Sequence, residues 1–405
     1  MGGGMLRVAL INRFFPPDPA VTGWSAQELV RYLGRHVPDL EVRVLAGSGR
    51  YRGGLRQVDS AHVRRISSLP LGGHGPLRLM ASLWDGYRLA KRAVLWADVV
   101  ISLTDPPLLG FWIGEMIAAS ERKIRWIEWT MDLYPEAFVA GAFVRRHAQA
   151  YGYVSRRVRQ HLPDRYICLG PGQHATVQRL RGCVRPATIL PCGIVEPTEP
   201  AGPSPAWRAG ERRVIIAYAG NLGEAHCAEA LIELVRCADA ERFKFVFALY
   251  GSKAGRAVAA LKDCRNIVWQ RHLGHKELAH ADVHLVSLKR EWAHISVPSK
   301  AVSAVCLGKP LLFIGPAEAD TMTLLGEAAW NVPDQTDGRY DSEDLRRVLA
   351  RIDNIGERIS REAAARRIHA RLLRGRDAAF EEIAVQIRCG AEGVDAACDG
   401  RSVAA

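Results

Sequence analysis

Short apolar runs recur along the chain, separated by polar loops and by segments with helical spacing. Leu6–Asn12 and Val283–Leu288 are rich in branched residues without polar alternation, which predicts strands buried on both faces. Met80–Trp96 places its apolar residues three or four apart, as in an amphipathic helix. Helical segments are also expected at about Trp24–Arg35 and over Ser342–Cys389. Strands that alternate with helices at this pitch predict parallel sheets covered by helices.

The strand–helix pattern runs through the chain twice. In the first half the expected strands are Leu6–Asn12, Leu40–Leu45, Asp98–Leu103 and Arg125–Trp129, and two short apolar pieces follow near its end, Ile167–Leu169 and Thr188–Leu190. In the second half they are Val214–Tyr218, Phe245–Tyr250, Ile267–Trp269, Val283–Leu288 and Leu311–Ile314. Between the halves, residues 186–205 hold six prolines, which favours an exposed, semi-rigid linker. Two such halves predict a cleft faced by the carboxyl ends of their strands.

Composition narrows the class of protein. The chain has 405 residues, more than one hydrophobic core usually supports, and 48% of them are hydrophobic. Nine scattered cysteines without a C-x-x-C pair predict reduced thiols in a cytoplasmic protein, not disulfides or a zinc site. The glycine-rich start resembles no signal peptide, and no apolar run approaches the length of about 20 residues that spans a membrane. We therefore expect a soluble or peripheral protein.

The excess of positive over negative charge lies entirely in the first half. Residues 1–185 carry 26 Lys and Arg against 14 Asp and Glu, whereas the remainder holds 29 of each. Anionic lipid, nucleic acid or an anionic substrate would each suit such an asymmetry. Nucleic acid is the weakest of the three, because no basic stripe interleaved with aromatic residues is present.

Several common motifs are absent from the sequence. It holds no G-x-G-x-x-G after a strand, no G-x-x-x-x-G-K-[ST] and no pair of aspartates at D-x-D spacing. H-E-x-x-H and G-x-S-x-G are also missing. These absences argue against five classes of protein or site: a dinucleotide oxidoreductase, a P-loop NTPase, a metal-clamped nucleotide site, a zinc peptidase and an α/β-hydrolase.

Polar residues follow four of the predicted strands. They are, in chain order, Asp18, Thr22 and Gly23; Asp132; Gly220, Asn221 and Gly223; and Arg290, Ser299 and Lys300. A loop that leaves a strand and enters a helix presents main-chain amides to an anion. The V-P-S-K loop at 297–300 adds a cation to such a helix start, so a phosphate-bearing ligand is the natural interpretation.

The chain resembles GT-B glycosyltransferases of glycosyltransferase family 4, especially members from bacterial polysaccharide assembly. The segments that carry this resemblance are NRFFPPDPAVTG (12–23), ADVVISLTDPPLLG (97–110), WTMDLYPEAF (129–138), YAGNLGEAH (218–226) and ADVHLVSL…VPSK…GKPLLFIGP (281–316). It implies Rossmann-like acceptor-binding residues 1–190 and Rossmann-like nucleotide-sugar-binding residues 191–365. Residues 366–405 would form a crossover helix, returning to the N-terminal domain, and a frayed tail.

The resemblance also implies roles for particular residues. Lys300, Ser299 and Arg290 would stabilise the departing diphosphate without a metal or other cofactor, and Gly220, Asn221 and Gly223 would approach the phosphates. Gly23 would let the main chain approach the donor, and Glu318 or Glu291 would contact a donor hydroxyl. Asp132 would act beside the sugar or acceptor hydroxyl as a positioning group or base. Asp18, Thr22 and Asp105 are expected on the acceptor side.

Three departures from the family pattern concern the donor contacts. Many members carry two glutamates eight residues apart, where this chain has Ala293 and Ala301. The basic pair that often follows the Gly-rich turn is replaced by Asn221 and a region containing His226. The histidine common before the Asp132 position is Met131.

The resulting hypothesis is a cytoplasmic glycosyltransferase that uses a nucleotide-diphosphate sugar, with a UDP-sugar as the first expectation. Its acceptor would be a glycan or lipid-linked molecule, and the family implies retention of anomeric configuration in polysaccharide or glycolipid biosynthesis. The basic first half suggests peripheral contact with anionic membrane, through residues such as Leu77–Trp96. Two alternatives remain open: a non-catalytic GT-B scaffold in an assembly complex, and a GT-B sugar-nucleotide epimerase or hydrolase.

Overall fold

The first half of the chain folds around a parallel seven-stranded sheet of order β3-β2-β1-β4-β5-β6-β7. The computed structural model describes residues 5–47, 62–67, 76–196, 202–334 and 340–391. The strands of this half are β1 (Leu6–Ile11), β2 (Leu40–Ala46), β3 (Val63–Arg65), β4 (Val99–Leu103), β5 (Arg125–Thr130), β6 (Arg165–Cys168) and β7 (Ala187–Ile189). Its helices are α1 (Val21–His36), α2 (Pro76–Trp96), α3 (Leu109–Ala118), α4 (Glu136–Ala140), α5 (Gln149–Gln160) and α6 (Pro171–Arg181).

The second half repeats this architecture with a parallel six-stranded sheet of order β10-β9-β8-β11-β12-β13. Its strands are β8 (Val214–Asn221), β9 (Phe243–Tyr250), β10 (Ile267–Trp269), β11 (Val283–Ser287), β12 (Leu311–Ile314) and β13 (Ala329–Val332). Its helices are α7 (Ala228–Cys237), α8 (Ala254–Ala260), α9 (His275–Leu278), η2 (Arg290–Trp292), α10 (Ser299–Cys306), α11 (Asp320–Leu325), η3 (Gly326–Ala328) and α12 (Ser342–Asp353). A final helix, α13 (Ile355–Ala391), follows.

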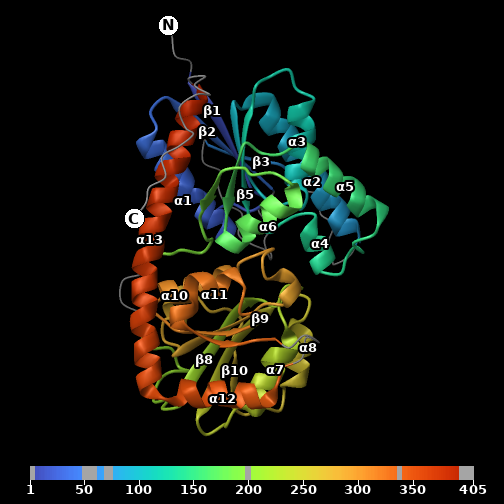
Figure 1. The fold of residues 1–405 in the computed structure, drawn as a ribbon. Helices are drawn as coiled ribbons and strands as arrows, with labels where there is room; N and C mark the ends of the chain where they lie inside the picture. The colour runs from blue at the N-terminus through green and yellow to red at the C-terminus, as the bar shows by residue number, and fades with distance from the viewer. Residues whose placement is uncertain (1–4, 48–61, 68–75, 197–201, 335–339, 392–405) are drawn as a thin grey trace.

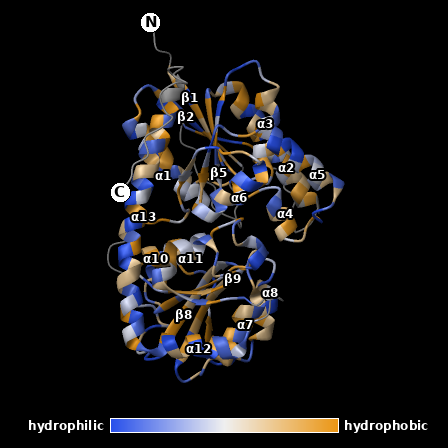
Figure 2. Ribbon diagram, in the orientation of Figure 1, coloured by the Kyte–Doolittle hydropathy of each residue, from blue (hydrophilic) through white to orange (hydrophobic). Residues whose placement is uncertain are grey.

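The predicted α/β class with two parallel sheets is confirmed. Figure 2 shows apolar residues concentrated in the strands of both sheets and polar residues on the outer helices. All residues of β4, β11 and β12 are buried, which explains why these strands are mainly apolar and show no regular alternation of polar and apolar residues. Among the boundaries that differ, one concerns predicted site residues: β8 continues to Asn221, so Gly220 and Asn221 are strand residues and not the turn that the sequence predicts.

Helix α13 runs along one side of both halves (Figure 1). Near its end, Arg125 of β5 donates to the main-chain oxygen of Gln386 at 2.5 Å. Glu382 pairs with Arg165 of β6 and accepts from Thr188 Oγ1 at 2.8 Å. The predicted return of a C-terminal helix to the first half is therefore confirmed. The helix begins at Ile355, ahead of the boundary placed at 366, and residues 392–405, where a frayed tail was expected, lie outside the described residues.

The chain that connects the halves is buried where it leaves the first sheet. Pro191, Cys192 and Ile194 are enclosed, and Ser303 of α10 donates to the main-chain oxygen of Gly193 at 2.9 Å. An exposed linker is therefore wrong for this part of 186–205, because the segment packs between α1 and α10. Residues 197–201, which hold two of the six prolines, lie outside the described residues.

The two halves also touch through polar contacts near the ends of their strands. The Asp320 carboxylate of α11 accepts from the main-chain amides of Gly172 and Gln173, both at 2.7 Å, at the start of α6. Asp132 and Ser296 form an isolated antiparallel bridge between the halves. The first contact neutralises a helix amino end with a carboxylate, a favourable pairing. The second places a predicted site residue at the junction.

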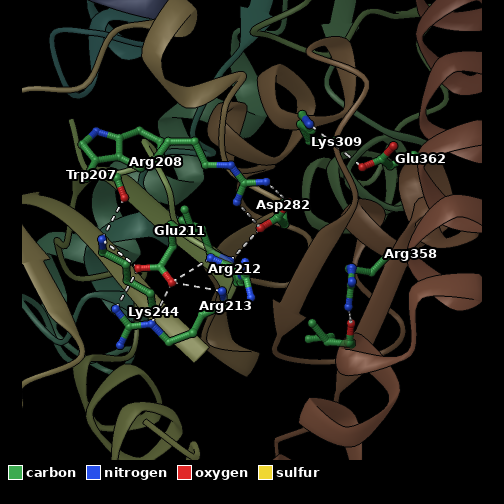
Figure 3. A network of polar contacts seen from close by, with 12 residues as sticks. Trp207, Arg208, Glu211, Arg212, Arg213, Lys244, Asp282, Lys309, Arg358 and Glu362 are labelled. Atoms are coloured by element: carbon green, nitrogen blue, oxygen red, sulfur yellow. Dashed lines mark hydrogen bonds and ion pairs between the residues drawn. The ribbon is translucent and has the colours of Figure 1, made fainter. Parts of the chain in front are cut away.

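An ion-pair network closes the opposite edge of the second sheet, at the amino ends of β8, β9 and β11 (Figure 3). Glu211 pairs with Arg213 at 2.7 Å and with Lys244 at 3.1 Å, and Arg208 pairs with Asp282 at 2.8 Å. Hydrogen bonds from Arg213 hold the pKa of Glu211 far below its usual range. This network anchors the end of the connecting segment to the sheet and leaves the other edge for the site.

No helix in the described ranges combines the length and apolar character needed to cross a bilayer.

Candidate active site

A cleft of about 950 Å³ lies between the two halves, at the carboxyl ends of their strands. The sheet orders place their switch points between β1 and β4 and between β8 and β11, where ligands of such sheets bind. The predicted site residues that line this cleft are Thr22, Asp105, Asp132, Gly220, Asn221, Gly223, Ser299 and Lys300. Residues from five strand ends of both halves therefore meet in one space.

Lys300, at the start of α10, is a cation of the second half that lines this cleft. Its Nζ donates to Tyr218 Oη and to the main-chain oxygen of Asn221, both at 2.8 Å, and lies 3.1 Å from His226 Nε2. Gly220, whose φ of 127° suits glycine, runs beneath the lysine side chain, which would stand 3.7 Å from an added Cβ. Burial lowers the pKa of Lys300 to about 7.

The amino end of α10 faces the same space as Lys300. Pro298, Ser299 and Lys300 all line the cleft, and Pro298 as N-cap offers no side-chain acceptor to the first-turn amides. Helix starts of this kind bind anions through free amides and the helix dipole. The lysine and the helix start together form an electropositive wall suited to a phosphate group.

Asp132 contributes a carboxylate from the first half. Its main-chain amide hydrogen-bonds Thr104 Oγ1 at 2.9 Å, directly after β5. Desolvation and the nearby charge of Asp105 raise the pKa of Asp132 to about 6, against a smaller opposing hydrogen bond with Ser296. A carboxyl with a pKa near the working pH can hold or accept a proton, as acid–base catalysis requires.

No protein-family model matches the chain. Over 358 residues it is 25% identical to the probable glycosyltransferase WbjE of Pseudomonas aeruginosa, covering 81% of this chain and 86% of the relative. Its structure is similar to that of WaaG, a glycosyltransferase involved in lipopolysaccharide biosynthesis, with a TM-score of 0.67, 15% identity, and coverage of 94% and 99% of the two chains. It is also similar to Anabaena HepE in complex with UDP and glucose, with a TM-score of 0.63, 13% identity, and coverage of 95% and 100%. The chain has the GT-B fold.

The expected enzyme class, a glycosyltransferase, is supported by the curated relative. The narrower assignment to family 4 stays a prediction. Within the described part of this GT-B chain, no cluster of three or more His, Cys, Asp or Glu side chains is placed to hold a metal ion.

Two predicted residues of the first half stand behind the GT-B cleft instead of in its wall. Asp18 is buried and pairs with Arg65 at 3.4 Å, where it fixes the loop after β1. Gly23 packs under the same loop, and a Cβ there would lie 2.7 Å from the main-chain oxygen of Phe14. The glycine at position 23 is therefore explained by close packing of main chain, not by approach to a donor.

Arg290 and Glu318 also do not line the cleft. They pair with each other at 2.7 Å, and Arg290 pairs with Asp334 at 2.9 Å. The structure therefore gives Arg290 a role in joining the loops after β11, β12 and β13. Both residues were expected at the donor. The sequence does not show that Asp334 forms an ion pair with Arg290 outside the cleft.

The positions of the missing glutamate pair are occupied by packed apolar side chains. Ala293 and Ala301 are both buried in the core that continues between the halves. Trp292, next to Ala293, lines the cleft with Ser296. A carboxylate could not be introduced at 301 without burial, so this wall of the GT-B cleft is rebuilt around small residues and a tryptophan.

Sequence reasoning missed several residues of the cleft wall. Tyr218 lies in the core behind this wall, and its hydroxyl accepts from Lys300, a contact that its place in an apolar strand does not predict. Residues Arg271, His272 and His275 line the far end of the cleft beyond β10. A useful signal was available for these three, because they follow a predicted strand in the half expected to bind the donor.

Proposed function

We propose that the protein transfers a sugar from a nucleotide-diphosphate sugar, with a UDP-sugar as the expected donor. The acceptor is a glycan or a lipid-linked molecule, and transfer proceeds with retention in polysaccharide or glycolipid biosynthesis. The observation that carries this proposal is the Lys300 ammonium at the amino end of α10, inside a cleft whose other wall presents Asp132. Membership of family 4 is part of the same proposal.

The two walls of the cleft have different roles, one toward the leaving phosphate and the other toward the acceptor. As the bond between the sugar and the diphosphate breaks, negative charge grows on the leaving phosphate, and Lys300 with the first amides of α10 stabilises it. Asp132 stands on the acceptor side, where it orients the attacking hydroxyl or takes its proton. Thr22 and Asp105 line the cleft near this wall and complete the acceptor side. No metal or organic cofactor is assigned a role.

UDP is expected to raise the melting temperature of the protein. Ligand at 100 times its dissociation constant adds about 2.7 kcal/mol to the free energy of unfolding. A thermal-shift series with UDP-, GDP- and TDP-sugars measures this effect and ranks the bases. If none of them shifts the transition at millimolar concentration, the scaffold alternative replaces this proposal.

The reaction products distinguish sugar transfer from the remaining alternatives, hydrolysis and epimerisation of the sugar nucleotide. A donor that binds is incubated with and without candidate acceptors, in buffer containing EDTA. Sugar transferred only with an acceptor supports the proposal, and activity in EDTA supports metal independence. Free nucleotide or an altered sugar nucleotide formed without any acceptor would indicate a hydrolase or epimerase.

The protein is further proposed to act in the cytoplasm, peripherally at the inner face of the plasma membrane. Helix α2 buries one face, including Leu89 and Ala93, while Met80 and Trp84 remain 63% and 51% exposed. Apolar side chains beside the basic residues of α2 suit the interface of an anionic bilayer.

The double variant Met80→Ser/Trp84→Ser is expected to reduce binding to vesicles of anionic phospholipid several-fold, since two interfacial side chains are lost. Flotation at low and high salt measures binding. Ile355→Ser/Ile359→Ser changes two side chains of similar exposure in α13 and serves as the matched control. Equal binding by both variants and the wild type would remove the membrane contact from the proposal.

A further inference from the structure

The Lys300 ammonium uses all three of its N–H donors within the protein. They are satisfied by Tyr218 Oη, the main-chain oxygen of Asn221 and His226 Nε2. The Tyr218 hydroxyl donates to the main-chain oxygen of Asn221 at 3.1 Å, so its oxygen is an acceptor toward the lysine. Burial alone accounts for the lowered pKa of Lys300, and no carboxylate within the described ranges offsets it. The ammonium is hydrogen-bonded but its charge is not compensated.

The ring of His226 is held in one protonation state by its second nitrogen. Nδ1 faces the main-chain oxygen of Ser287, which can only accept, so Nδ1 carries the proton. Burial and then the charge of Lys300 lower the pKa of His226 well below its usual value, so the ring is neutral. Its Nε2 therefore presents a lone pair to the lysine.

Other titratable groups around this pair do not supply the missing negative charge. Tyr218 is neutral, because burial raises its pKa well above the usual value. Lys253 donates to the main-chain oxygen of His226 at 2.8 Å and pairs with Glu224 at 3.6 Å, so that carboxylate already has a cation. A second cation at the position of the His226 ring would stand about 3 Å from Lys300 and repel it.

We propose that His226 is a positioning residue for Lys300: its neutral imidazole accepts from the ammonium and fixes it at the amino end of α10, where a nucleoside diphosphate supplies the compensating charge. The inference rests on the proposed function for its ligand. It explains why this cleft has a histidine where a second basic residue is expected. One cation, held in place by neutral hydrogen-bond acceptors, takes the role of the basic pair that family members often carry.

Two substitutions by amide residues test the roles of the two ring nitrogens of His226 one at a time. In His226→Asn the side-chain amide reaches the place of Nδ1, so the bond to Ser287 is kept and the acceptor for Lys300 is lost. In His226→Gln the amide reaches the place of Nε2, so an oxygen can still accept from Lys300. We expect His226→Asn to weaken UDP binding about tenfold or more between pH 6 and 8.5, and His226→Gln to stay within about threefold of the wild type. Titration calorimetry measures both.

A second measurement needs no nucleotide. The folded protein without nucleotide is acylated over a range of pH, and mass spectrometry of its peptides gives the rate at the Lys300 amine and therefore the pKa of that amine. We expect its midpoint to fall in His226→Asn, because the ammonium loses an acceptor, and to move less in His226→Gln.

The outcomes are distinct. Equal losses of UDP affinity in the two variants, or an unchanged Lys300 midpoint in His226→Asn, would overturn the positioning role. If the wild type binds no nucleotide while the midpoint moves as expected, the proposed function fails and the contact between His226 and Lys300 stands.

Discussion

Lys300→Ala is expected to lower the rate of sugar transfer by about 100- to 1000-fold, the usual effect of removing one group that stabilises developing negative charge. It should also weaken UDP binding about tenfold or more, because the positive charge that faces the diphosphate disappears. Steady-state kinetics with the donor that gives the largest thermal shift, together with calorimetry of UDP, measure the two effects. The transfer rate and the UDP affinity both fall in this variant, because the charge of the lysine attracts the phosphate in the ground state and in the transition state.

The matched control is Lys309→Ala. Lys309 lies in the same half, just beyond α10, and makes a 3.9 Å ion pair with Glu362 away from the cleft. Its transfer rate and UDP affinity should equal those of the wild type. Full activity of Lys300→Ala with an unchanged Kd for UDP would show that the electropositive wall is not the donor site.

Asp132→Asn is expected to reduce transfer by about 100- to 10,000-fold, the range over which a general base or positioned carboxylate contributes. The affinity for UDP should stay within about twofold, because Asp132 belongs to the opposite wall. Kinetics and calorimetry on the same preparation therefore separate this variant from Lys300→Ala. A parallel loss of UDP affinity would place Asp132 at the donor and refute the division between the two walls.

The pH dependence of transfer tests the protonation state of Asp132. If the carboxylate is the active form, the rate rises with pH through about 6, the raised pKa of this group. The charge of Asp105 helps to raise that pKa, so Asp105→Asn should move the acidic limb to lower pH. A pH–rate profile that is identical in the two proteins would exclude Asp132 as the titrating group.

The same pKa predicts an effect of Asp132→Asn on stability. A carboxyl whose pKa is higher in the folded protein than its ordinary value of 3.8 binds its proton more tightly when folded. Its contribution therefore favours folding below about pH 4 and is lost as the pH rises through about 6. An asparagine escapes this loss, so the variant should be more stable than the wild type at pH 7, by roughly 1–3 kcal/mol. Thermal or urea unfolding at pH 4 and pH 7 measures the difference.

The sequence predicts the fold well because buried parallel strands leave a strong local signal. β11 and β12 read as strands from their apolar residues alone, and the polar loops after them point to one edge of a sheet. The same rule placed Lys300, Ser299 and Asp132 in the cleft wall, where the structure has them. Each of these predictions depends only on the position of a residue within its own strand–loop–helix unit.

The errors concern contacts between distant segments. Arg290 follows a strand as Lys300 does, but Asp334, beyond β13, pairs with it outside the cleft. Asp18 is held by Arg65 of β3, and no spacing in the sequence brings these two together. His226 and Tyr218 acquire their contacts with Lys300 only when β8 and β11 become neighbours. Such pairings depend on strand order, which the local pattern of apolar residues does not encode.

Helix α13 has a consequence for how the chain is made. The first sheet is synthesised first, yet Arg125 and Arg165 bond to partners that follow 261 and 217 residues later. At about 5–20 residues per second, β5 leaves the ribosome roughly 10 to 50 s before its last contact exists. Throughout this interval the apolar surface that α13 covers is open to chaperones and to aggregation. The full set of contacts between α13 and the N-terminal half can therefore form only after translation has passed Gln386.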